Sequence, residues 1–199
     1  MASFSGVHKS RVLIVPVHDA DQQVEKVSEN LRCELSVQSD IDCAVLPARR
    51  HVGLRVPDHD VLVLGLAARA CPMPGLLRET LAALPEGTGR LAFGFATSSA
   101  FGSRALLWLG LKGLAERGYH VIGGAAVRRD GSGQDLLVQA ITGFVRSDGA
   151  ARSSIALRTA LFDLVRRQPS LLEIIFVEAT SLLAGTISAI RAGGSEEGR

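Results

Sequence analysis

The sequence has few cysteines, and their arrangement limits what they can do. Among its 199 residues there are three, Cys33, Cys43 and Cys71, and no two of them form a CxxC pair. An odd number of unpaired cysteines argues against a disulfide framework. It fits reduced thiols in a reducing compartment, so we expect a cytoplasmic protein.

The sequence also has almost no excess charge. The formal net charge is +2, and the arginines are scattered instead of alternating with aromatic residues along one face, so we expect no nucleic-acid binding. His18, His51 and His59 fall in three separate loops without a metal-ligand spacing. We therefore expect no metal site.

Long hydrophobic runs are nearly absent. The first eleven residues lack the apolar stretch of a signal peptide, which gives no indication of secretion. Residues 171–190 are the one segment that resembles a membrane span, but Glu173 and Glu178 interrupt it. Two carboxylates are costly in the centre of a bilayer, so we expect no membrane span.

What the sequence does contain is a regular alternation of short apolar runs and amphipathic segments. Apolar residues make up 47% of the chain and charged residues 21%, a balance that predicts a folded protein with a well-filled interior. Runs rich in β-branched residues predict strands, and apolar residues at helical spacing predict helices. Strands are expected at residues 12–17, 41–46, 61–64, 90–96 and 120–127, and helices at 24–35, 76–84, 102–117 and 135–145.

This alternation predicts an α/β protein with a doubly wound parallel sheet, because parallel strands need crossover connections. Strict alternation over five strands predicts five helices before residue 148, of which the spacing gives bounds for the four named above. In such a sheet the ligand crevice lies beyond the carboxyl ends of the strands, where the strand order reverses. The loops that matter are therefore residues 18–23, 65–75 and 97–103.

Three segments resemble the flavodoxin family and related flavin-dependent reductases. Residues 61–77 are similar to the strand and the first loop beside the flavin, residues 95–114 to the second such loop, and residues 118–124 to the approach to the last strand. The resemblance covers residues 11–146. It implies a flavodoxin-like fold with five parallel strands in the order 2-1-3-4-5.

The resemblance also implies FMN as the cofactor and electron transfer or a reductase reaction as the function. Phe101 would cover one face of the flavin ring and Arg69 would stack on it, whereas Thr97, Ser98 and Ser99 either bind the pyrimidine edge or cap the next helix. The implied cofactor-binding residues are His18, Gln22, Gln23, Ala67, Ala68, Arg69, Thr97, Ser98, Ser99, Phe101 and Gly102.

The loop after the first strand departs from the family pattern. Flavodoxins place hydroxyl and glycine residues there to hold the FMN phosphate at a helix N-terminus, but residues 18–23 contain no Ser, Thr or Gly. Asp19 and Asp21 instead place carboxylates where the phosphate would lie. They either cap the following helix or, with His18, bind a cation.

The residues beyond the flavodoxin-like unit predict a separate helical part. We divide the chain into a domain of residues 1–148, a helical hairpin of 149–192 and a disordered tail of 193–199. The second helix of the hairpin is apolar nearly all round, so residues 151–192 are expected to bind a second copy of the chain or a different protein. Two alternatives to a redox protein follow: a flavin-free module that binds its partner through these helices, and a subunit that completes the site of a larger enzyme.

Overall fold

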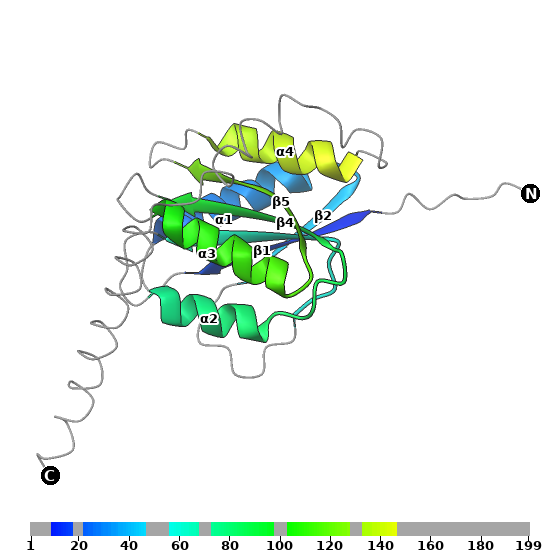
Figure 1. Ribbon diagram of the computed structural model, residues 1–199. Coiled ribbons are helices and arrows are strands. Elements are labelled where there is room, and N and C mark those ends of the chain that lie inside the picture. Colours follow the sequence, from blue (N-terminus) through cyan, green and yellow to red (C-terminus); the bar gives the residue numbers. More distant parts are fainter. Residues whose placement is uncertain are drawn as a thin grey trace, which may run out of the picture.

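In the described residues, five strands form a parallel sheet, and two helices cover each of its faces (Figure 1). The computed structural model describes residues 9–17, 22–46, 56–67, 73–97, 103–127 and 133–146. In chain order the elements are β1 (Ser10–Val17), α1 (Gln22–Ser36), β2 (Ile41–Val45), β3 (Val61–Ala67), α2 (Met73–Ala83), β4 (Leu91–Thr97), α3 (Ser103–Glu116), β5 (His120–Val127) and α4 (Gln134–Arg146).

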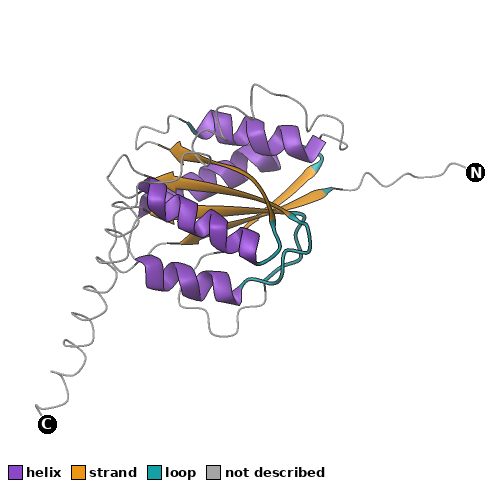
Figure 2. Ribbon diagram, viewed as in Figure 1, coloured by secondary structure: helices purple, strands orange, loops and turns teal. Residues whose placement is uncertain are grey.

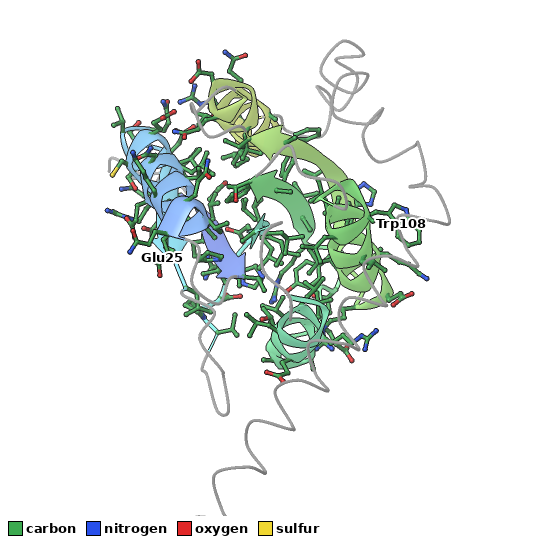
Figure 3. The ribbon with its side chains drawn as sticks, turned by 90° about the vertical axis from the view of Figure 1, so that its left-hand side faces the viewer. Glu25 and Trp108 are labelled. Carbon is green, nitrogen blue, oxygen red and sulfur yellow. The ribbon has the colours of Figure 1, made fainter. Side chains whose placement is uncertain are left out.

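All strand pairs are parallel, and the order across the sheet is β2-β1-β3-β4-β5. Helices α1 and α4 contact each other on one face, and α2 and α3 contact each other on the opposite face (Figures 2 and 3). The sequence prediction of a doubly wound, flavodoxin-like sheet in the order 2-1-3-4-5 is confirmed. Every described connection that contains a helix places that helix on a sheet face, as right-handed crossovers require.

The burial of the strands explains their sequences. All seven residues of β3 are buried, because helices cover both faces of this central strand, and it is a continuous run of Val, Leu, Gly and Ala. Strand β2 lies at the edge and alternates between buried and more exposed residues. Strands that are covered on both faces read as continuous apolar runs, whereas half-covered strands alternate.

Helix α1 covers its face of the sheet with the residues that the spacing predicted. Val24, Val27, Leu31 and Leu35 are all buried, since residues three and four positions apart share one side of a helix. Glu25 points away from the sheet on one side of the molecule (Figure 3). On the opposite side Figure 3 shows Trp108 of α3, which is half-buried and has the Lys112 ammonium 5.3 Å from its ring centre.

Glycines allow α3 to lie close to the sheet. Gly94 of β4 and Gly124 of β5 are neighbours in the register. A Cβ atom at Gly94 would lie 2.7 Å from a methyl carbon of Leu107 and 2.8 Å from one of Leu111, both on α3. Because the strands carry no side chains here, the leucines of α3 fill the space directly above the backbone.

Helix α3 ends where the sequence predicted. Gly118 has a φ of +84°, a left-handed conformation that glycine adopts without steric cost. The Tyr119 amide then donates to the Leu114 carbonyl at 3.1 Å, and the Gly118 amide donates to the Ala115 carbonyl at 3.0 Å. These bonds satisfy carbonyls at the end of the helix and turn the chain into β5.

One expectation differs from the structure. We counted five helices, and the described residues hold four; Leu46 and residues 56–60 of the connection between β2 and β3 are not helical, and residues 47–55 lie outside the described ranges. The proposed domain boundary at residue 148, the hairpin 149–192 and the tail 193–199 lie outside the described residues. Within the described ranges, no helix has the length and apolar character needed to cross a membrane.

Candidate functional site

The carboxyl ends of the parallel strands meet at one edge of the sheet. Strands β1, β3, β4 and β5 end there with Val17, Ala67, Thr97 and Val127, and all four residues are buried. In the register Ala67 pairs with Thr97, and Thr97 pairs with Val127. All four helices follow these ends or the loops after them, so their N-termini lie at the same edge (Figure 1). We call this the carboxyl edge.

The strand order reverses between β1 and β3. From β1 the chain crosses through α1 to β2 on one side, whereas from β3 it crosses through α2 to β4 on the other side. Helices α1 and α2 cover opposite faces, so the connections diverge at this point. Diverging connections leave a crevice beyond the strand ends, which is where doubly wound proteins bind ligands.

Among the described residues at this edge, Thr97 has an unsatisfied polar group. Its side chain is only 1% exposed, and its hydroxyl oxygen Oγ1 has no hydrogen-bond partner. A buried hydroxyl without a partner destabilises a protein by about 1–3 kcal/mol. A ligand that carries a hydrogen-bonding group and reaches Thr97 would remove this cost.

Two other predicted residues lie in the first turn of α1. Gln22 is exposed and Gln23 is half-buried, and both follow directly on the loop after β1. The turn also contains Glu25, whose carboxylate faces the positive end of the helix dipole. The first turn of α1 therefore presents side-chain amides and a carboxylate, whereas hydroxyl groups and a positive charge suit a phosphate.

The remaining predicted residues lie outside the described part of the chain. The structure brings Ala67 and Thr97 together as register partners and places Gln22 and Gln23 at the start of the neighbouring α1. The helix-capping and cation-binding interpretations of Asp19 and Asp21 also concern residues outside the described ranges. The other predicted cofactor-binding residues that lie there are His18, Ala68, Arg69, Ser98, Ser99, Phe101 and Gly102.

The two described cysteines differ in exposure. Cys33 of α1 is exposed, and Cys43 of β2 is half-buried. Burial raises the pKa of the Cys43 thiol to about 12, because a thiolate is poorly solvated there. Among the residues that the structure describes, no group of three His, Cys, Asp or Glu side chains is arranged to hold a metal ion.

The difference in exposure predicts selective labelling of the thiols. In a Cys71→Ser variant at pH 8, we expect a disulfide reagent such as DTNB to react quickly with one thiol, Cys33, and not with Cys43. A thiol whose pKa is about 12 is ionised in roughly one molecule in ten thousand at this pH. Adding the Cys33→Ser substitution should abolish the fast reaction until denaturant is added. A fast reaction that survives in this double variant would contradict the burial of Cys43.

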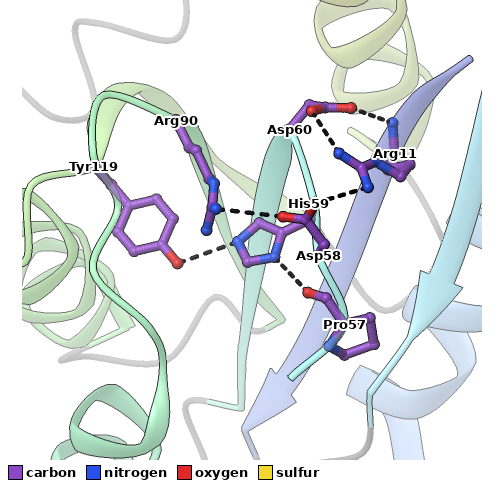
Figure 4. Close-up of polar contacts among 7 residues, drawn as sticks. All are labelled: Arg11, Pro57, Asp58, His59, Asp60, Arg90 and Tyr119. Atoms are coloured by element: carbon purple, nitrogen blue, oxygen red, sulfur yellow. Dashed lines mark hydrogen bonds and ion pairs between the residues drawn. The ribbon is translucent and has the colours of Figure 1, made fainter. Parts of the chain in front are cut away.

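A second polar cluster lies at the opposite, amino edge of the sheet (Figure 4). From the sequence, we placed His59 in a loop but did not predict that these residues form a cluster. The available signal was the run of polar residues 57–60 directly before β3. What the sequence does not show is that this run meets Arg11 near the start of β1 and the residues directly before β4 and β5. The seven residues of the cluster are Arg11, Pro57, Asp58, His59, Asp60, Arg90 and Tyr119.

Comparison with known proteins adds a likeness in structure alone. No protein-family model and no curated protein sequence matches the chain. Among solved structures it is similar to oxidised flavodoxin 1 from Bacillus cereus, with 16% sequence identity and a TM-score of 0.47 over 69% of this chain and 95% of that chain. The strand order and the parallel register, and not this likeness, establish that the chain has a flavodoxin-like fold.

Proposed function

We propose that the carboxyl edge of β3 and β4 binds a flavin ring, and that the protein is a flavodoxin-like electron-transfer or reductase protein. The observation that supports the proposal most directly is the buried Thr97 hydroxyl without a partner. It lies at the edge where doubly wound proteins bind cofactors. When bound, a flavin would supply the redox chemistry, and the protein would supply its position and surroundings.

The neighbours of Thr97 suit a flat and largely apolar ligand. Ala67 pairs with Thr97 on one side and Val127 pairs with it on the other, and both side chains are fully buried. A single hydrogen-bonding group among apolar side chains is the usual composition of a cofactor site, because the apolar surface gives affinity and the polar group fixes the orientation. In this proposal Thr97 Oγ1 bonds to the polar edge of the ring.

The acidic residues around the start of α1, at the other end of the proposed site, disfavour a ligand that is anchored by a phosphate group. The sequence places Asp19 and Asp21 just before α1, and Glu25 lies in its first turn. Negative charges near a phosphate dianion oppose its binding unless a cation intervenes. We therefore expect riboflavin to bind at least as tightly as FMN, which reverses the preference of a phosphate-anchored site.

Flavin titration of two threonine variants tests the proposal. We expect Thr97→Val to weaken riboflavin binding about tenfold, since one hydrogen bond in a buried site contributes about 0.5–1.5 kcal/mol. Binding would be measured by the quenching of flavin fluorescence, together with the visible spectrum of the purified protein. Thermal unfolding without flavin should show no loss of stability in Thr97→Val, because the substitution removes an unpaired hydroxyl and keeps the shape of the side chain.

The matched control is Thr142→Val. Thr142 lies near the end of α4 that is remote from the carboxyl edge, and its buried Oγ1 also has no partner. This variant makes the same chemical change and should leave flavin affinity unchanged. Equal affinities in the two variants would remove Thr97 from the site. A colourless protein that binds neither riboflavin nor FMN would reject the flavin proposal and favour a flavin-free module that binds a partner.

A further inference from the structure

The amino edge of the sheet contains a buried histidine that two hydrogen bonds hold in place. His59 lies two residues before β3 and is 1% exposed, and Tyr119 lies directly before β5 and is 4% exposed. The imidazole Nδ1 lies 2.9 Å from the Pro57 carbonyl oxygen, and Nε2 lies 3.1 Å from the Tyr119 hydroxyl (Figure 4). The two rings are nearly parallel, with 6.0 Å between their centres.

These two partners determine which ring nitrogen of His59 carries a proton. A carbonyl oxygen only accepts hydrogen bonds, so Nδ1 must carry the proton that it shares with Pro57. The neutral imidazole then has a bare Nε2, which accepts the proton of the Tyr119 hydroxyl. In this arrangement the neutral form of His59 satisfies both of its nitrogens and the tyrosine hydroxyl at once.

Protonation of His59 would break this pattern. With a second proton, Nε2 becomes a donor and points at a hydroxyl that was donating to it. The tyrosine hydrogen must then find another acceptor within a buried site. Arg90, which also hydrogen-bonds the Tyr119 side chain, offers donors only. Protonation therefore leaves a buried hydroxyl hydrogen or a buried N–H without a partner.

The charged groups around His59 do not compensate for the added charge. Burial lowers the pKa of His59 most strongly, and the positive charge of Arg90 lowers it further, whereas the hydrogen bond to the Pro57 carbonyl and the charges of Asp58 and Asp60 act in the opposite direction without reversing the shift. Both aspartates already pair with Arg11, at 2.8 Å for Asp58 and 3.3 Å for Asp60. Asp58 pairs in addition with Arg90 at 3.3 Å. From the β5 side, Arg117 contributes one more positive charge close to Tyr119.

From this geometry we propose that His59 and Tyr119 form an acid-sensitive latch. At neutral pH the latch holds together the amino ends of β3 and β5, which are not adjacent in the sheet. When the imidazole takes up a proton from solvent, the hydrogen bond from Tyr119 to Nε2 can no longer form, a buried hydrogen is left without an acceptor, and the amino ends loosen. The latch lies at the edge opposite the proposed flavin site, and it does not depend on flavin binding.

The backbone around the latch shows which parts would respond. The Leu91 amide donates to the Asp60 carbonyl at 3.2 Å, and the His120 amide donates to the Arg90 carbonyl at 2.8 Å. These bonds close the amino ends of β3, β4 and β5 directly beside His59 and Tyr119. If the latch opens, the amides of Leu91 and His120 should exchange with solvent more readily than amides at the carboxyl edge.

The sign of the pH effect follows from the lowered pKa. The unfolded chain would bind the proton near the ordinary value of 6.5, whereas the folded chain resists it. The stability that the neutral latch contributes is therefore complete above about pH 6.5. It is lost as the pH falls from that value through the lower pKa of the folded state.

Comparing His59→Gln with the wild type tests the latch. Glutamine keeps a hydrogen bond to Tyr119 within reach and takes up no proton in this range. We expect acidification from pH 7 to pH 5 to raise the unfolding equilibrium constant of the wild type several-fold more than that of His59→Gln, because the unfolded wild-type chain takes up this proton at a higher pH than the folded chain does. Other titrating groups cancel in this difference. His120→Gln, which removes an exposed histidine one residue from Tyr119, should behave like the wild type.

Two readouts on the folded wild-type protein localise the effect. Imidazole ¹⁵N chemical shifts should show His59 protonated at Nδ1 alone at pH 7 and at both nitrogens in acid. Over the same range, the exchange protection of the Leu91 and His120 amides should fall about tenfold more than that of Ala67 and Thr97 at the other edge. Equal pH dependence in wild type and His59→Gln, or a loss of protection spread evenly over the sheet, would overturn the proposal.

Discussion

Replacing Phe93 by alanine is expected to lower the free energy of unfolding by about 3–5 kcal/mol, which is the usual cost of removing a buried phenylalanine. Phe93 lies in the interior strand β4 and is 0% exposed. Its ring meets the edge of the Phe144 ring of α4, with 5.4 Å between the ring centres. The substitution therefore leaves a cavity between the sheet and α4 and also removes an aromatic contact.

Denaturant unfolding, followed by the fluorescence of Trp108, measures this loss. Trp108 is the only tryptophan in the sequence and lies in α3, on the opposite face of the sheet from Phe144 in α4. The control is Val37→Ala, because Val37 is 82% exposed and its truncation should change stability by less than about 0.5 kcal/mol. Similar stabilities of the two variants would contradict the packing of Phe93 described above.

Replacing Gly87 by alanine is expected to destabilise the protein by about 3 kcal/mol, near the upper end of the range for an overpacked site. A Cβ atom at Gly87 would lie 2.4 Å from the backbone nitrogen of Tyr119 and 2.6 Å from its Cα atom. Backbone atoms cannot rotate away as side chains do. The substitution must push apart two segments joined by the hydrogen bond of the Gly87 amide to the Arg117 carbonyl, which measures 2.7 Å.

The same substitution at Gly143 provides a control with the opposite sign. Gly143 lies inside α4, and a Cβ atom there would meet nothing within 4 Å. Alanine is a better helix former than glycine, so Gly143→Ala should raise the stability by roughly 0.5–1 kcal/mol. Thermal unfolding of both variants separates a steric effect from a general effect of the residue change. A Gly87→Ala variant that is as stable as the wild type would show that the two segments are not in contact.

The secondary structure was largely predictable because its signals are local. The continuous apolar run of β3 and the helical spacing of Val24, Val27, Leu31 and Leu35 each depend on a few neighbouring residues. Boundaries differed where tertiary contacts extend an element. Strand β3, for instance, continues through Gly65 to Ala67, because β4 pairs with it as far as Thr97.

Gly65 illustrates why a local pattern was not sufficient there. As a glycine after four apolar residues, it read as the end of the strand. In the structure its missing side chain makes room for the Phe95 ring of β4, since a Cβ atom would lie 2.5 Å from the ring. The glycine is required by a neighbour thirty positions away in the sequence, and not by a turn.

The edge of the sheet at which a ligand is expected was predictable from the sequence, whereas the surroundings of individual side chains there were not. The alternation of strands and helices implied which loops lie at the carboxyl edge, because topology determines where parallel strands end. Thr97 was identified in this way. The sequence alone left open whether its hydroxyl caps the next helix or binds the pyrimidine edge of a flavin, and only the folded chain shows that it is buried without a partner.

By itself, the sequence determined the class of fold, the bounds of most elements and the edge of the sheet at which a ligand is expected. These follow from short-range patterns of apolar and polar residues. The tertiary structure decided which distant groups meet: His59 with Tyr119 across 60 positions, Gly87 with the backbone of Tyr119, and Arg11 with Asp58 and Asp60. Such pairings depend on strand order and register, which bring separate segments within hydrogen-bonding distance and leave no periodic trace in the sequence.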